Sequence, residues 1–280
     1  MRCDSHTHIV GPADRFPQVP GRTYLADVAA LETLRACGAA RGIARFVIVQ
    51  PSFYGTDNSA TLGSLDALGP AGRGVAVIDP DAVSAETLAD FDRRGVRGLR
   101  INLYSPLGSE PGPLDAGFAA MAKVANSQDW HVEVIAPLPV LLGSAEALTR
   151  ASVPVVIDHY GLYAGLRPGS AEGRRLLALL GLPHVWIKLS APYRVSADPL
   201  CTQPDREWLG AILAVAAERC VWGSDWPFTP AHDQHKGAAI VAPYRKLSYE
   251  AVLDDFLGTL PSAELAERIM AVNPARLYGF

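Results

Sequence analysis

The stretch Val221-Trp222-Gly223-Ser224-Asp225-Trp226-Pro227 decides how the rest of the chain is interpreted. An apolar run that begins at Cys220 delivers a single carboxylate, Asp225, and Pro227 then stops the strand because proline cannot donate to a sheet ladder. We therefore expect Asp225 at the C-terminal tip of a strand. In a parallel α/β barrel, these tips form the face that carries the active site.

Seven further apolar or β-branched runs precede this stretch at intervals suited to a strand and a crossover. The eight predicted strands cover residues 3–10, 45–52, 74–79, 96–103, 130–136, 153–160, 184–191 and 219–226. Apolar positions at three- and four-residue spacing predict helices over 27–41, 57–68, 84–94, 114–128, 138–151, 170–180 and 204–217. This alternation predicts a parallel sheet, and eight units favour a closed (β/α)8 TIM barrel that takes up residues 1–280 as one domain.

Two observations complete the fold prediction. No GxGxxG or GxxxxGK[ST] motif follows the first strand, which argues against an open nucleotide-binding sheet. After the eighth strand we expect helices at 249–257 and from Ser262, and Asn273-Pro274 is typical of a helix N-cap followed by proline at the first helical position.

Composition excludes several classes of protein. The 280 residues are 49% hydrophobic and 19% charged, with a net charge of -4 and no basic cluster, which argues against a nucleic-acid partner. No apolar run approaches the roughly 18 residues of a membrane span, so no membrane partner is expected. The four cysteines form no CxxC pair and nothing resembles a signal peptide, so we predict a cytoplasmic monomer or small homo-oligomer.

Histidines and one carboxylate gather at the predicted strand ends. Alternation along a strand puts His6 and His8 on one face, close enough to ligate one metal ion or polarise one substrate oxygen. By itself His-x-His could equally be a pair of hydrogen-bonded polar residues in a loop. His159 ends the sixth run and Asp225 the eighth, so three imidazoles and a carboxylate converge if the barrel closes.

Other strand-end groups suit substrate binding. Arg100 ends the fourth strand, and its planar fork matches a carboxylate, which predicts an anionic substrate; the alternative is an internal ion pair with a carboxylate such as Asp79. Further candidates for contact with substrate are Tyr24, Ser52, Asn102, Lys188, Ser190, Tyr193 and Arg194. Two histidines begin strands and are expected to be structural, His131 and His184. Two more lie in the loop 228–243, His232 and His235, where solvent exposure or a lid over the site are the alternatives.

Together these motifs resemble the amidohydrolase superfamily. The segments that carry the resemblance are Asp4-Ser5-His6-Thr7-His8, Asp158-His159-Tyr160-Gly161, Val221 to Pro227 and Asn273-Pro274-Ala275-Arg276-Leu277-Tyr278-Gly279. Within the superfamily they are similar to the branch of 2-pyrone-4,6-dicarboxylate lactonase and related sugar-lactone and sulfomuconolactone hydrolases. The resemblance implies a (β/α)8 barrel that hydrolyses a small carboxylated lactone, with Asp225 as general base and His6, His8 and His159 around the carbonyl.

The resemblance also sets expectations for cofactor and charge. Members like the pyrone lactonase need no metal, whereas others hold divalent ions, so the alternative is a metal-dependent amidohydrolase or decarboxylase. In that alternative one Zn or Mn ion is held by His6, His8, His159 and Asp225. Ser105, Leu162 and Ile135 stand where the pyrone lactonase carries arginines and a tyrosine, which implies a less negatively charged substrate. A third hypothesis, a barrel that binds a small acid without turnover, leaves the general base unexplained.

Overall fold

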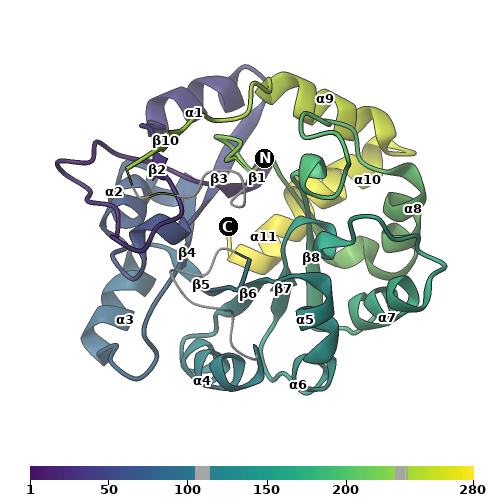
Figure 1. The fold of residues 1–280 in the computed structure, drawn as a ribbon, viewed down its shortest axis with the longest axis horizontal. Coiled ribbons are helices and arrows are strands. Elements are labelled where there is room, and N and C mark those ends of the chain that lie inside the picture. The colour runs from purple at the N-terminus through teal and green to yellow at the C-terminus, as the bar shows by residue number, and fades with distance from the viewer. Residues whose placement is uncertain (105–113, 231–236, 238) are drawn as a thin grey trace.

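Eight parallel strands form a ring in the computed structural model, which describes residues 1–104, 114–230, 237 and 239–280 (Figure 1). Their order is β1-β3-β4-β5-β6-β7-β8-β9. Their bounds are β1 Arg2–Thr7, β3 Ile43–Val49, β4 Gly72–Ala76, β5 Val96–Asn102, β6 His131–Ile135, β7 Val155–Ile157, β8 Val185–Ser190 and β9 Cys220–Gly223. The ring closes where Thr7 bridges to Trp226 and the His8 amide donates to the Trp226 carbonyl at 2.8 Å. The predicted (β/α)8 barrel is therefore confirmed.

Helices surround the strands (Figure 1). They are α1 Leu31–Ala39, α2 Ser59–Leu68, α3 Ala85–Arg93, α4 Leu114–Ser127, α5 Leu138–Gly143, α6 Ala145–Thr149, α7 Ala171–Leu180, α8 Arg206–Ala216, α9 Tyr249–Thr259, α10 Ala263–Glu267 and α11 Asn273–Tyr278. Serine or aspartate N-caps start several of them, as Ser262 does for α10 at the predicted position. None of the helices in the described ranges is long and apolar enough to cross a membrane.

Three local predictions were wrong. The segment predicted as a helix over 27–41 is helical only in α1, because the residues before it are extended. Ala29 bridges to Val10, and the strand β2 (Leu25–Ala26) pairs with β10 (Val241–Ala242). The helix predicted over 138–151 is two short helices that meet at Ser144. Asn273 is no N-cap, since its backbone is helical and its side chain donates to the carbonyls of Ala217 and Cys220 at 2.9 and 2.7 Å.

The helix α11 covers the end of the barrel opposite the strand tips, where Tyr278 packs on Cys3, Val47, Val49 and Val75. In Figure 1, α11 crosses the middle of the ring. Since this end is filled by apolar packing, the C-terminal ends of the strands form the open face.

The contact between β1 and β9 depends on Gly223 and Ser224 and on Asp4. A Cβ on Gly223 would lie 2.5 Å from the Cβ of His6, so only glycine permits this approach of the strands. Across the same contact, Asp4 accepts from the Ser224 amide at 2.9 Å and from the Tyr249 hydroxyl at 2.9 Å. Burial raises the pKa of Asp4 to about 6.

Candidate active site

The predicted catalytic residues lie at the C-terminal tips of three strands. His6 lies near the end of β1 and His8 follows this strand, His159 follows β7, and Asp225 follows β9. The backbones of His159 and Asp225 have φ angles of 48° and 60°, in the left-handed region. Each such residue costs about 1–3 kcal/mol and persists only when its surroundings determine it, as they often do at functional sites.

All three imidazoles face one oxygen of Asp225. Its Oδ1 lies 3.4 Å from His8 Nε2, 3.5 Å from His6 Nε2 and 4.0 Å from His159 Nε2. Oδ1 is buried and has no hydrogen-bond partner among the described residues. A buried carboxylate oxygen without a donor is costly, so this atom is suited to receive a proton, a water molecule or a cation.

The other oxygen of Asp225 is occupied. Tyr193 donates its hydroxyl to Oδ2 at 2.6 Å, and Arg194 donates from Nε at 3.0 Å and lies at 2.9 Å through Nη2. Burial by itself would raise the pKa of Asp225, but the Arg194 guanidinium and the histidines hold it well below its usual range. Asp225 is therefore ionised at neutral pH, with Oδ1 as the oxygen that no described residue hydrogen-bonds.

Two of the histidines are fixed through their other ring nitrogen. His8 Nδ1 lies 2.8 Å from the carbonyl of Val49, which only accepts, so Nδ1 carries the proton and Nε2 offers a lone pair. His159 Nδ1 lies 2.8 Å from the hydroxyl of Ser190. Burial lowers the pKa of His159 to about 4, so its ring is neutral.

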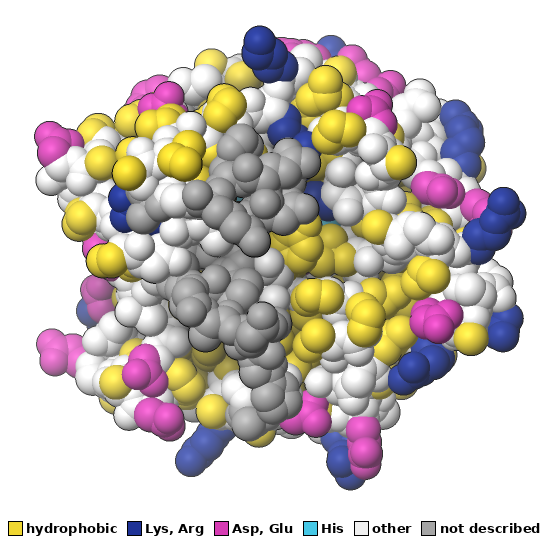
Figure 2. All heavy atoms as spheres, viewed as in Figure 1, with side chains coloured by type: hydrophobic (Ala, Val, Ile, Leu, Met, Phe, Trp, Pro, Cys, Tyr) yellow, Lys and Arg dark blue, Asp and Glu magenta, His cyan; other side chains and the backbone are white. Residues whose placement is uncertain are grey.

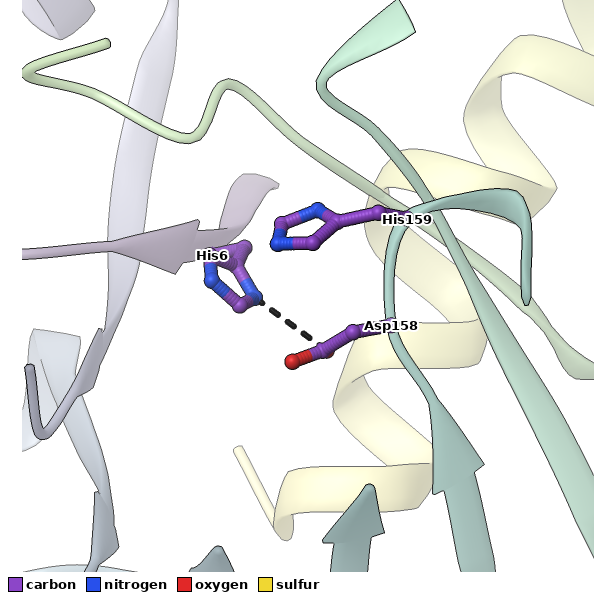
Figure 3. Close-up of side chains that lie close together, drawn as sticks. All are labelled: His6, Asp158 and His159. Carbon is purple, nitrogen blue, oxygen red and sulfur yellow. Dashed lines mark ion pairs between the residues drawn. The ribbon is translucent and has the colours of Figure 1, made fainter. Parts of the chain in front are cut away.

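A layer of buried charges lies beneath His6. Its Nδ1 is 3.1 Å from Lys188 Nζ and 3.4 Å from Asp158 Oδ1, and Lys188 is also hydrogen-bonded to Glu133. Figure 3 shows the His6 ring facing both His159 and Asp158, with its ion pair to Asp158 marked. Lys188 therefore faces His6 and Glu133 instead of the substrate, contrary to one of the roles considered for it from the sequence.

Arg100 faces the mouth of the barrel, but internal contacts also hold its guanidinium group. It donates to Asp158 Oδ2 and to the carbonyl of Gln50, both at 3.1 Å, and its Nε lies 3.6 Å from Glu133 Oε1. The internal ion pair considered as an alternative is thus present, but with Asp158 and Glu133 instead of Asp79. The positive charge of Arg100 is therefore already compensated by carboxylates of the protein.

Most of the predicted substrate residues line one narrow pocket next to His8 and His159. It is bounded by Tyr24, Ser52, Phe53, Arg100, Asn102, Ile135, Arg194 and Thr229, among others. Its free volume of about 20 Å³ holds roughly one water molecule. Ser190 lies beside this pocket without lining it and instead holds His159. Phe53 and Thr229 were not predicted as site residues, because neither belongs to a recognisable motif.

A larger, mostly apolar pocket of about 650 Å³ adjoins the first at Arg194. Tyr104, Leu138, Leu142, Leu162 and Leu166 are among its lining residues. Figure 2 shows hydrophobic side chains gathered on this face of the molecule. The open face therefore offers apolar surface next to the polar site.

The other histidines were predicted to be structural or to lie in the loop 228–243. His131 is buried beside Tyr278 at the closed end of the barrel, and His184 Nε2 lies 2.9 Å from the Leu148 carbonyl, so both are structural as predicted. His232 and His235 lie outside the described residues, as do the other residues of 231–236 and residue 238 in the loop considered as a lid.

Two groups of residues in the described part of the chain could hold a metal ion. They are His6, His8 and Asp225, and His6, Asp158 and His159; within each group the ligand atoms lie within 4.8 Å of one another. Neutral imidazole and carboxylate are ligands that suit zinc. His6 belongs to both groups, so its lone pair decides whether either is complete.

Comparison with known proteins identifies the family. A model of the family described as Amidohydrolase matches residues 3–280. The chain belongs to the amidohydrolase family. Amidohydrolase relatives include the 4-sulfomuconolactone hydrolase of Hydrogenophaga intermedia, 30% identical over 99% of this chain and 88% of the relative. Another is the 2-pyrone-4,6-dicarboxylate hydrolase of Comamonas testosteroni, 29% identical over 98% of this chain and 89% of the relative.

A solved structure supports the same branch of the family as these two relatives. The putative 2-pyrone-4,6-dicarboxylic acid hydrolase of Pseudomonas putida superimposes with a TM-score of 0.82 at 30% identity, over 99% of this chain and 97% of that one. The resemblance to the lactone-hydrolase branch is therefore confirmed.

Proposed function

We propose that this amidohydrolase hydrolyses the ring ester of a small carboxylated lactone. The observation that carries the proposal is the unpartnered Oδ1 of Asp225, which faces three imidazole Nε2 atoms beside a pocket bounded by Arg100 and Arg194. Relatives named as hydrolases of lactones support the same reaction class.

In the proposed reaction, Asp225 Oδ1 accepts a proton from water as the water oxygen bonds to the lactone carbonyl carbon. The carbonyl oxygen becomes an oxyanion, which an N–H from His6 or His159 stabilises by about 3–4 kcal/mol for each well-placed donor. Collapse of this intermediate breaks the ring C–O bond. Asp225 then returns the proton to the leaving alkoxide or enolate, and the product is an open-chain hydroxy or keto acid.

Arg194 has two roles in this proposal. It lies against Asp225 Oδ2 and donates to Thr229 Oγ1 at 2.6 Å, so it fixes the general base. It also lines both pockets, which places it where a substrate carboxylate would dock. With Arg100 already paired to Asp158, little uncompensated positive charge remains, which supports a substrate carrying fewer carboxylates than a pyrone dicarboxylate.

The substrate would also need space. The polar pocket holds about one water molecule as it stands. We infer that side chains at the mouth move when substrate binds, and that an apolar substituent would extend past Arg194 into the larger pocket. A panel of monocarboxylated lactones with and without alkyl or aryl substituents tests this: faster hydrolysis of the substituted members supports it, and exclusion of them contradicts it.

A second candidate uses the same residues as ligands. His6, His8, His159 and Asp225 would hold one divalent ion such as Zn or Mn. The grouping of His6, His8 and Asp225 supports this, and His159 Nε2 lies 4.0 Å from Asp225 Oδ1. When bound, such an ion would polarise the scissile carbonyl and acidify water. Metal analysis together with assays before and after chelation separates this candidate from the metal-free reaction.

The cellular setting also stays a prediction. We propose a cytoplasmic monomer or small homo-oligomer that acts on a small anionic molecule. Sedimentation at micromolar concentration would measure the assembly state directly.

A further inference from the structure

Lys188 occupies a position that the proposed reaction does not use. It lies on β8 and is fully buried under the catalytic histidines. Its Nζ is 3.1 Å from His6 Nδ1 and 3.8 Å from Asp158 Oδ1, and it is hydrogen-bonded to Glu133 Oε2. Charge balance with Glu133 accounts for one contact of Lys188 but not for its hydrogen bond to His6 Nδ1.

The direction of this contact determines where the proton of His6 resides. An ammonium group has three donors and no acceptor, so Lys188 can hydrogen-bond Nδ1 only through the lone pair of that nitrogen. A neutral imidazole carries one N–H, which must then be on Nε2. This N–H points toward the reaction centre, since Nε2 lies 3.5 Å from Asp225 Oδ1.

The neighbouring His8 has the opposite arrangement. Its Nδ1 faces the Val49 carbonyl, an acceptor, and leaves a lone pair on Nε2. This is the arrangement found for histidines that bind metals, which donate their second N–H to a carbonyl or carboxylate. His6 has a similar option, because Asp158 Oδ1 lies 3.4 Å from its Nδ1 and has no hydrogen-bond partner among the described residues.

We propose that Lys188 is a positioning residue that holds His6 as the Nε2–H tautomer. His6 then acts as a hydrogen-bond donor to the reacting oxygen, and it withholds the lone pair that a divalent ion needs. His6 belongs to both candidate metal groups of the described chain. Because Lys188 engages the lone pair on Nδ1 and leaves the proton on Nε2, neither nitrogen of His6 is free to bind an ion, so Lys188 disfavours metal binding in both groups. The donor role rests on the proposed lactone hydrolysis, whereas the tautomer and the metal affinity do not.

The decisive variant removes Lys188 without leaving its partner charged. In Lys188→Met/Glu133→Gln both members of the buried pair are lost, so neither is left as an uncompensated charge. His6 Nδ1–H then turns to Asp158 and Nε2 gains the lone pair. We expect the affinity for Zn or Mn, measured by competition with a chromophoric chelator, to rise at least tenfold.

Two further variants serve as controls for the double variant. Lys188→Arg retains a cationic donor and is expected to keep the low metal affinity of the wild type. Lys123→Met removes an exposed lysine on α4 and is expected to change nothing. Unchanged metal affinity in a folded Lys188→Met/Glu133→Gln protein would overturn the proposal.

The tautomer itself can be observed in the wild type. Long-range ¹⁵N–¹H correlation spectra of the metal-free protein, with His6→Gln to assign the signal, distinguish Nε2–H from Nδ1–H. We expect Nε2–H for His6; Nδ1–H would overturn the proposal even if the double variant failed to fold. Neither measurement needs a substrate, so failure on a lactone panel would count against the proposed function and not against this role of Lys188.

Discussion

Replacing Tyr193 with Phe would test how the reactive carboxylate is tuned. The Tyr193 hydroxyl donates to Asp225 Oδ2 at 2.6 Å, and both groups are buried. A hydrogen bond to a charged group contributes about 1.5–3 kcal/mol. Since 1.36 kcal/mol corresponds to one pKa unit, its loss should raise the pKa of Asp225 by roughly one to two. Arg194 remains as the second partner of Oδ2, so the carboxylate stays ionised at neutral pH.

The expected result is a displaced pH profile. Asp225 must be ionised to accept a proton. In Tyr193→Phe the acid limb of the kcat/KM profile should therefore move to higher pH by about one to two pH units, while kcat/KM above pH 7 changes little. The matched control is Tyr163→Phe, a buried tyrosine stacked on Trp208 at 4.2 Å instead of on the catalytic carboxylate. An acid limb that stays in place, or moves equally in both variants, would refute the reasoning.

Three further changes have outcomes that follow from single contacts. Asp225→Asn should lower kcat by about 10²–10⁴, the usual contribution of a general base, while a substrate still binds by calorimetry; near-normal turnover would remove Asp225 from its role. Asn273→Ala leaves the buried carbonyl of Cys220 and the part-buried carbonyl of Ala217 without their amide donor and should lower the free energy of unfolding in urea by about 1–3 kcal/mol; a loss under 0.5 kcal/mol would contradict this. Asp4→Asn should remove a pH dependence of stability. The pKa of Asp4 in the folded protein is raised to about 6, so Asp4 stabilises the wild type below about pH 4. The free energy of unfolding should then fall by about 3 kcal/mol as the pH rises through 6. Parallel plots of this free energy against pH for the two proteins would contradict the prediction.

The architecture could be predicted from the sequence because buried parallel strands are apolar on both faces and the intervening helices repeat at 3.6 residues. The same pattern placed His6, His8, His159 and Asp225 at strand tips, where the barrel brings them together. Local signals failed where tertiary contacts outweighed them. Asn273 has the sequence context of an N-cap, yet its side chain satisfies two carbonyls at the start of β9.

Pairings across the barrel could not be predicted. Arg100 lies on β5, Asp158 follows β7 and Lys188 lies on β8, and a sequence does not show which of these side chains share a level inside the ring. Asp79 was therefore as reasonable a partner for Arg100 as Asp158. The relation of Tyr193 to Asp225 is of the same kind, since it depends on the turn after β8 reaching the tip of β9.

Hydrolysis of a panel of carboxylated lactones by metal-free protein tests the central claim most directly. The protein is assayed as purified and after chelation, with residual metal quantified in both samples. We predict ring opening at an undiminished rate in the metal-free protein, and its loss in Asp225→Asn. Activity that disappears on chelation and returns with Zn or Mn would contradict the metal-free mechanism, and failure to open any lactone of the panel would contradict the proposed function.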